Sequence, residues 1–355
     1  DFINIYFILF ITSLFLEVQL EYDLKHELTV CCGGLGSVYV AYHRPTHRKV
    51  AIKKIQLDLI EEVNLIQQEI YITRQLQHPN ILSYEISFVN DLNLYIVAPL
   101  MIYGSCRDVL NFYNSGFPET AIAIILRDVI NGLDYVHSKG FIHRGIRGSH
   151  MLINHLGTVL LSGLRGVGEL IVHGKRQRVL HSLPPQAKDT LNWLSPEVLE
   201  QNMLGYNEKS DIYSLAVCAC ELANGVEPFA DMPCTLMFTE KVRGYAPKLL
   251  DSITLSEYSN SESSDDLQAM FLNRKFSESF HQFVDMCSRR EPSMRPKASS
   301  LLHHSFFKTI KSRDNLLEYL KPIESLEFLV KDNCDTINDL NVSALNIQND
   351  EKWIF

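Results

Sequence analysis

The pattern of apolar and polar positions divides the chain into a strand-rich first part and a longer helical second part. Between residues 22 and 98, short runs rich in β-branched and aromatic residues occur, among them GSVYVAYH, KVAIKKIQL and LNLYIVA, with one helical stretch near 61–76. From 102 onward, apolar residues recur at intervals of three and four, as in TAIAIILRDVINGLDYVHSKG and DIYSLAVCACELANG. The pattern predicts an α+β protein with a small β-rich lobe (22–98) and a larger, mainly helical lobe (102–307).

Three segments fit neither lobe. Residues 2–16 form an apolar run that is short for a bilayer span and lacks the basic start and small-residue cleavage site of a signal peptide. We therefore leave 1–21 outside the domain as a gene-prediction or fragment artefact, with an anchor or signal as the alternative. The stretch 256–266 has four acidic residues, five serines and no basic residue, which predicts a mobile loop. Residues 308–355 are expected to form a polar tail that ends in Trp-Ile-Phe.

Composition and charge narrow the class of partner. Hydrophobic residues make up 46% of the 355 residues, which is typical of a soluble globular protein. The net charge of -9 and the lack of a long basic run argue against binding to nucleic acid or to an anionic membrane, because phosphate neutralisation needs clustered Lys and Arg. The eight cysteines are scattered without zinc-ligand spacing, so we expect reduced cytosolic thiols and no metal site.

Two adjacent motifs indicate a nucleotide site. The stretch CCGGLGSV at 31–38 has Gly33 and Gly36 at positions where a backbone can approach phosphates closely, although Cys31 stands in place of a first glycine. Alone, this loop fits a plain hairpin turn better. The following strand contains VAIK, a motif that resembles the one on a strand of protein kinases, and the resemblance implies that Lys53 would hold phosphates and pair with Glu69 on the next helix. Together the motifs outweigh the reading of Lys53 and Glu69 as two exposed charges.

These motifs resemble those of protein kinases, and the resemblance implies where an adenine ring would lie. It places Val38 and Ala51 above the ring, Leu152 below it, Ala98 at the gatekeeper position, and the backbone N–H of Met101 at the hinge between the lobes. Pro99 of the hinge lacks an N–H but keeps the carbonyl that an adenine amino group needs. Purine binding is therefore expected.

The same resemblance implies that the catalytic carboxylates are missing. HRGIRGSH at 143–150 stands where active kinases have H-R-D-L-K-x-x-N, so Gly145 replaces the aspartate that orients the substrate hydroxyl and His150 replaces a metal-binding asparagine. Ser162 and Gly163 stand where D-F-G begins, which removes the main carboxylate ligand of Mg²⁺. The sequence therefore predicts a pseudokinase with no catalytic residues, no enzymatic activity and no metal site.

The landmarks of the helical lobe are retained. Glu197 in a Ser-Pro-Glu motif is expected to form a buried bidentate pair with Arg295, and Asp211 begins the helix that follows. This pair is a scaffold feature with no part in phosphoryl transfer. The predicted fold is therefore that of a bilobal protein kinase, over 22–307.

Several longer strings are similar to the STRAD adaptors, pseudokinases related to the sterile-twenty kinases: HMLI (150–153), LSGLR (161–165), HGKRQRV (173–179), WLSPEVL (193–199) and ACELANG (219–225). The resemblance implies ATP binding without productive Mg²⁺, and allosteric activation of a serine/threonine kinase of liver kinase B type. The family's C-terminal Trp-Glu-Phe docks on a helical-repeat scaffold. Here Trp353 and Phe355 are kept as anchors, while Ile354 replaces the glutamate. The expected location is the cytoplasm, with the nucleus as a second site.

Three alternatives stay open. The chain could be a weakly active serine/threonine kinase of the sterile-twenty group, rescued by a displaced acid such as Glu169 or Asp189. It could be a membrane-anchored, receptor-like binding module that uses the apolar run 2–16. The aromatic residues at the C-terminus could also be a chance feature of a frayed end.

Overall fold

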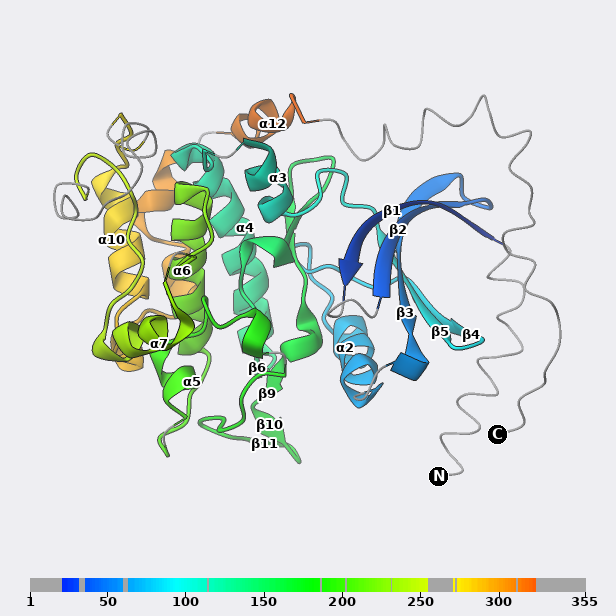
Figure 1. Cartoon of the computed structure of the whole chain (residues 1–355), viewed down its shortest axis with the longest axis horizontal. Coiled ribbons are helices and arrows are strands. Elements are labelled where there is room, and N and C mark those ends of the chain that lie inside the picture. The colour runs from blue at the N-terminus through cyan, green and yellow to red at the C-terminus, as the bar shows by residue number, and fades with distance from the viewer. Residues whose placement is uncertain are drawn as a thin grey trace.

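The structure is a computed structural model that shows a lobe built on a β-sheet beside a larger helical lobe (Figure 1). The described residues are 21–31, 36–59, 63–113, 115–185, 187–201, 203–230, 232–254, 271, 273–310 and 312–323. The sequence-based predictions for Gly33, the apolar run 2–16, the acidic loop 256–266, Trp353 and Phe355 lie outside these residues.

The smaller lobe is an antiparallel sheet with the strand order β1-β2-β3-β5-β4. Its strands are β1 (Tyr22–Cys31), β2 (Gly36–His43), β3 (Arg48–Gln56), β4 (Ile86–Asn90) and β5 (Asn93–Pro99). Alternate residues of each strand point to opposite faces, so β3 places Ile52 in one apolar cluster and Ile55 in another. The second cluster also contains Ile66 of α2 (Val63–Gln75), which therefore packs on that face. A short 3₁₀ helix, η2 (Leu57–Leu59), follows β3.

The larger lobe is helical. Its helices are α3 (Cys106–Tyr113), α4 (Glu119–Ser138), α5 (Pro196–Glu200), α6 (Lys209–Asn224), α7 (Cys234–Arg243), α10 (Glu278–Cys287), α11 (Ala298–Leu301) and α12 (Asp314–Leu320). Helix α6 is buried from Ser210 to Asn224, which explains why its sequence is apolar on all sides rather than along one stripe. It ends at Gly225, whose φ of +79° is the left-handed conformation that favours glycine at a helix C-terminus.

Short strands and turns of the larger lobe carry much of the candidate site. Three two-stranded pairs, β6 with β9, β7 with β8 and β10 with β11, lie between α4 and α5 along the chain. These elements, with the 3₁₀ helices of the larger lobe, are β6 (Phe141–Ile142), η3 (Gly148–His150), β7 (Met151–Ile153), β8 (Val159–Leu161), η4 (Leu164–Gly166), β9 (Gly168–Glu169), β10 (Ile171–Val172), β11 (Lys175–Arg176), η5 (Ala187–Asp189), η6 (Pro292–Met294) and η7 (Ser305–Thr309).

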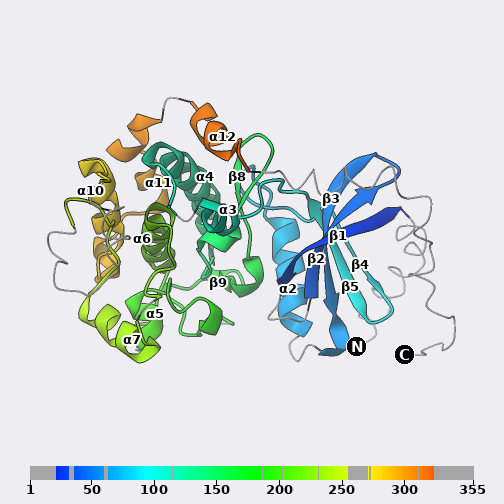
Figure 2. The same cartoon turned by 45° about the horizontal axis from the view of Figure 1, so that its top comes forward.

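The folded unit continues past the boundary at 307 that the sequence pattern predicts. That boundary falls within η7, and α12 beyond it packs on α4 (Figure 2). Leu316 and Leu320 of α12 are fully buried. Just before the helix, Arg313 forms a bidentate ion pair with Asp128 of α4, with distances of 2.5 and 3.0 Å. The segment 312–323 is therefore part of the helical lobe.

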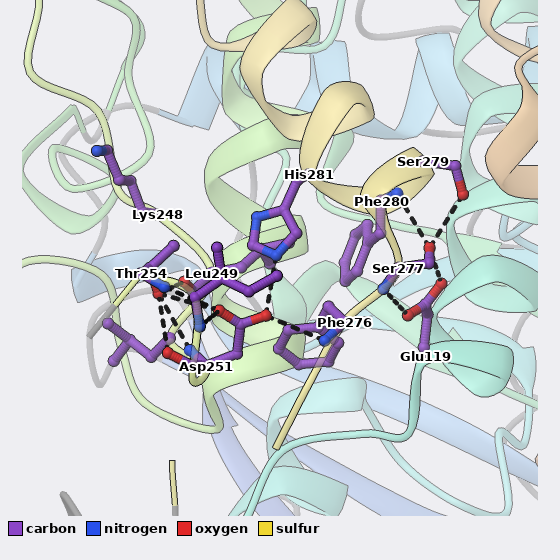
Figure 3. Close-up of polar contacts among 12 residues, drawn as sticks. Glu119, Lys248, Leu249, Asp251, Thr254, Phe276, Ser277, Ser279, Phe280 and His281 are labelled. Carbon is purple, nitrogen blue, oxygen red and sulfur yellow. Dashed lines mark hydrogen bonds and ion pairs between the residues drawn. The ribbon is translucent and has the colours of Figure 1, made fainter. Parts of the chain in front are cut away.

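The buried carboxylate of Asp251 connects two parts of the chain that lie before and after the predicted acidic loop 256–266 in sequence (Figure 3). Asp251 accepts hydrogen bonds from Thr254 N at 3.1 Å, Phe276 N at 3.0 Å and His281 Nε2 at 2.9 Å. Next to it, Ser277 N and Oγ donate to the carboxylate of Glu119 at the start of α4. These bonds connect residues 251–254 with residues 276–281, and they attach Ser277 to α4.

Among the described residues, no helix combines the length and the apolar character that a membrane crossing requires. Cys106, Cys218, Cys220 and Cys287 are buried, Cys234 is exposed, and none of these five forms a disulfide.

Candidate functional site: the nucleotide cleft and the activation segment

An ion pair connects the sheet to α2. Lys53 Nζ on β3 lies 3.1 Å from Glu69 Oε1 and 3.4 Å from Oε2. Tyr84 Oη donates to the same carboxylate at 2.5 Å. Glu69 is only 2% exposed, and although burial opposes its ionisation, the charge of Lys53 and the bond from Tyr84 lower its pKa below the ordinary value. The pair holds α2 against the sheet and leaves the Lys53 side chain 19% exposed.

The residues predicted to surround adenine come from both lobes. In the sheet, Ala51 pairs with Ala98, and Val38 on β2 pairs with Lys53. Ala98 and Met101 are buried, and Met101 follows β5 directly in the connection to the helical lobe. Leu152 lies on β7, which bridges to Ser105 just after that connection. Gly36 begins β2.

The loop 143–150 is a closed hydrogen-bond network. His150 Nδ1 donates to Gly145 O at 2.7 Å, and its Nε2 accepts from Arg147 Nη2 at 3.2 Å. His143 Nε2 donates to Ser162 O at 2.9 Å, while its Nδ1 accepts from Gly145 N. Burial, reinforced by the positive charge of Arg147, lowers the pKa of His150 to about 3. His150 is therefore neutral, and both of its ring nitrogens are already engaged.

Next to this loop, Gly163 and His150 leave no room for a side chain at position 163. Ser162 Oγ donates to His150 O at 3.1 Å. Gly163 has a φ of +81°, and a Cβ added to it would lie 2.3 Å from His150 Nδ1. Leu164 instead packs with Ile72 and Leu76 beneath α2. Motif spacing alone, which aligns residue 163 with the packing Phe of D-F-G, does not reveal this role of Leu164.

The donors present do not suit Mg²⁺, a cation that prefers oxygen ligands and especially carboxylates. The part of the chain that the structure describes has no group of three or more His, Cys, Asp or Glu side chains that could hold a metal ion. The Ser162 hydroxyl and the His150 ring nitrogens are committed to other contacts.

A cation that sequence reasoning missed lies near the Lys53–Glu69 pair. Arg165 follows Leu164 in η4, and its Nε and Nη1 are buried with no hydrogen-bond partner in the described chain. Its charge contributes to the lowered pKa of Glu69. Arg165 is half-buried, and guanidinium nitrogens that are buried without acceptors are costly unless an anion satisfies them. This group therefore fits a phosphate-bearing ligand, although the string LSGLR gave no sign of that role beyond its charge.

Arg144 fixes the activation segment, which we define as residues 162–197. Its guanidinium donates to Gly166 O at 2.5 Å and Val167 O at 3.2 Å near the start of the segment. It also lies 3.4 Å from Ser182 O and 3.0 Å from Tyr206 Oη. In many kinases an arginine orders this segment by binding an added phosphate. Here backbone carbonyls and the hydroxyls of Ser182 and Tyr206 take that place.

Two buried carboxylates, Asp211 and Glu197, stabilise the helical lobe around this site. Asp211 accepts from the backbone N–H groups of His143 and Arg144 and from His137 Nε2, each at 2.8 Å. Burial opposes its ionisation, but the bond and charge of His137 lower its pKa overall. Glu197 and Arg295 form the predicted bidentate pair at 2.6 and 2.9 Å, with Arg295 1% exposed.

The two lobes and the ion pair between β3 and α2 define a protein kinase fold, and residues 25–307 match the family described as protein kinase domain. STE20-related kinase adapter protein alpha of Bos taurus is 43% identical over 81% of this chain and 85% of its own length. The alpha protein of Homo sapiens is 42% identical over 81% of this chain and 73% of its own length. The beta protein of Homo sapiens is 37% identical over 85% and 79%.

The chain therefore belongs to the family of STE20-related kinase adapter proteins. This confirms the α+β, bilobal fold and the resemblance to STRAD adaptors that the sequence motifs predicted.

Proposed function

We propose that this protein is a catalytically inactive adaptor that binds ATP and activates a serine/threonine kinase of liver kinase B type. The observation that carries the proposal is the combination of an intact Lys53–Glu69 pair with uncharged residues at 145, 150 and 162. The names of the relatives, kinase adapter proteins, support the adaptor role.

ATP binding fits the residues of the cleft. Ala51, Ala98 and Leu152 offer apolar contacts for a purine ring, and Met101 offers a backbone N–H at the connection between the lobes. Lys53 and the unpartnered nitrogens of Arg165 would hold the phosphates with charge that a metal ion usually supplies. The bound triphosphate would contribute negative charge and favour the closed arrangement of the lobes.

Phosphoryl transfer is not supported by the same residues. Gly145 has no group to accept or orient a hydroxyl proton, a role worth roughly two to four orders of magnitude in rate. Neither Ser162 nor His150 provides a carboxylate for a metal that would stabilise charge on the phosphates.

The partner surface proposed here consists of the segment from about Arg165 to Leu194, the helical lobe and α2, the helix that carries Glu69. Arg144 holds the segment in place without a phosphate group, as a docking surface requires. We further propose that Trp353 and Phe355 anchor the tail to a helical-repeat scaffold, and that the complex works in the cytoplasm, with the nucleus as a second location.

The test uses the purified full chain. ATP binding is measured by equilibrium dialysis with EDTA and then with Mg²⁺, and the rate of the partner kinase is measured with and without this protein. We expect saturable ATP binding that needs no Mg²⁺, activation of the partner, and no phosphate transfer by this chain alone.

Lys53→Met should weaken ATP binding, whereas Lys54→Met, a neighbour on the opposite face of β3, should not. Phosphate transfer by the chain at ordinary kinase rates would replace the proposal with the alternative of an active sterile-twenty-type kinase. Failure to raise the partner's rate would remove the adaptor role.

A further inference from the structure

A buried lysine from another helix contacts the end of the activation segment. Lys241 lies on α7, and its side chain is 0% exposed. Its Nζ donates to Leu191 O at 3.2 Å, Asn192 O at 2.6 Å and Leu194 O at 2.9 Å. Three backbone carbonyls of one short turn thus converge on a single ammonium group.

The surroundings of this ammonium are those of a cation site without a carboxylate. The Nζ lies 4.8 Å from the ring centroid of Phe229 and 5.7 Å from that of Tyr213, within the range of cation–π attraction. Phe229 has a φ of 59°, which is unusual for an aromatic residue. No ion pair joins Lys241 to an acid in the described part of the chain. Burial lowers its pKa to about 7, whereas the three carbonyl oxygens that accept from Nζ favour the protonated form. The carbonyl oxygens therefore take the place of a counter-ion.

The neighbouring carbonyls of the segment are bound in the same way by the helical lobe. Ser214 Oγ on α6 donates to Trp193 O at 2.8 Å, and Arg147 Nη1 donates to Asp189 O at 2.7 Å. Lys188 and Asp189 are exposed on the other side. The backbone of this turn is satisfied from within, so its outer face can meet another protein without leaving these polar groups unpaired.

We propose that Lys241 is the positioning residue that holds residues 190–194 in the shape that docks the partner kinase. The inference rests on the proposed adaptor function and adds how its surface is kept ready. A segment that is already ordered loses less conformational entropy when it binds, so its affinity for the partner is higher.

The first experiment compares Lys241→Met with Lys308→Met, a control at an exposed lysine on η7. Amide hydrogen exchange is measured by mass spectrometry on peptides that contain Trp193 and Leu194, whose amides are hydrogen-bonded within the turn. We expect Lys241→Met to accelerate this exchange by about tenfold or more and to weaken partner binding by about tenfold. ATP affinity should stay within about twofold of wild type because the cleft is untouched, and the control should match wild type throughout. If the Met variant does not fold, Lys241→Gln, which can still donate to carbonyls, is used instead.

A second measurement separates the ammonium from simple packing. Lys241→Ala leaves a space that n-propylammonium ions fit, with n-propanol as the uncharged molecule of similar shape. Added n-propylammonium should restore slow exchange and partner binding, whereas n-propanol should not. Equal rescue by both would mean that only volume matters and would overturn the role of the charge.

The remaining outcomes are also decisive. Unchanged exchange in Lys241→Met would show that other contacts hold the turn. Faster exchange with full partner affinity would show that the partner does not dock there, while leaving the adaptor function intact. If wild-type protein itself fails to activate the partner, the proposed function fails, and the exchange comparison still decides whether Lys241 holds the turn.

Discussion

His150 and Gly163 share one space near the cleft, which makes their substitutions interdependent. A Cβ at position 163 would lie 2.3 Å from Nδ1 of the imidazole, and the φ of +81° adds strain for any residue other than glycine. The apolar contact with α2 is provided by Leu164 instead. Reintroducing a phenylalanine at 163 therefore requires changing position 150 as well.

A double-mutant cycle tests this coupling. Gly163→Ala alone should lower the free energy of unfolding by about 2–4 kcal/mol, from the clash and the positive φ together. In a His150→Gly background the same change should cost only about 1–2 kcal/mol, since the φ penalty alone remains. Urea unfolding of the four proteins measures both values. Additive costs would mean that the two residues do not compete for space.

Arg144 permits a second test at the residue scale. Arg144→Met leaves the carbonyls of Gly166 and Val167 without their donor, so the activation segment should become much more sensitive to limited proteolysis. Arg144→Lys should rescue little, because a single ammonium cannot span contacts that a planar guanidinium reaches. Arg178→Met, at an exposed arginine of the same segment, serves as the control. Equal cleavage of the wild-type and Arg144→Met proteins would contradict the assigned role.

At the scale of elements, Asp251 connects the chain before 255 with the start of α10 (Figure 3). Burial opposes its ionisation, but hydrogen bonds from Phe276 N and His281 lower its pKa below the ordinary value of 3.8. Because the folded pKa is the lower one, the contribution of Asp251 to stability is complete above the ordinary pKa. It is lost as the pH falls through the folded pKa.

The expected result is a difference in acid sensitivity. Asp251→Asn should lower the free energy of unfolding at pH 7 by about 1–3 kcal/mol and should lose less further stability than wild type below about pH 4. Asp285→Asn, at an exposed aspartate on α10, should follow the wild-type curve. Urea midpoints measured from pH 7 to pH 3 make the comparison. Parallel curves for wild type and Asp251→Asn would exclude the carboxylate as a source of the acid dependence.

At the scale of the whole molecule, the folded domain includes helix α12. This helix lies beyond residue 307, where the match to the protein kinase family ends. Tyr113 of α3 stacks on Tyr319 with ring centroids 4.3 Å apart and donates to its carbonyl at 2.5 Å. With Leu316 and the Arg313–Asp128 pair, these contacts fix α12 to the helical lobe. The segment 312–323 therefore belongs to the folded domain rather than to the predicted tail.

Substitution within α12 tests this extension. Leu316→Ala should lower the free energy of unfolding by about 2–5 kcal/mol, as for other buried leucines. Glu318→Ala, at an exposed position of the same helix, should change it by less than about 0.5 kcal/mol. Thermal and urea unfolding of the full chain provide both values. If Leu316→Ala matched the control, the domain would end near 307 after all.

The alternation of apolar residues and the spacing of motifs are enough to predict part of the fold and part of the candidate site. Alternation identifies β3, and the VAIK motif with the helix that follows is enough to pair Lys53 with Glu69. The roles of Lys241 and Arg165 could not be recognised from the sequence. Nothing near Lys241 along the chain shows that three backbone carbonyls converge on its Nζ, and nothing near Arg165 shows that two of its nitrogens are buried without a hydrogen-bond partner. Such roles arise from contacts between segments far apart along the chain.

The guanidinium of Arg144 also has a consequence for signalling. A kinase whose activation segment waits for a phosphate can be switched off again by a phosphatase. In this protein the same position is filled by its own main chain. Under the proposed adaptor function, activation of the partner would then depend on how many copies of this protein are present, because the contacts of Arg144 need no added phosphate.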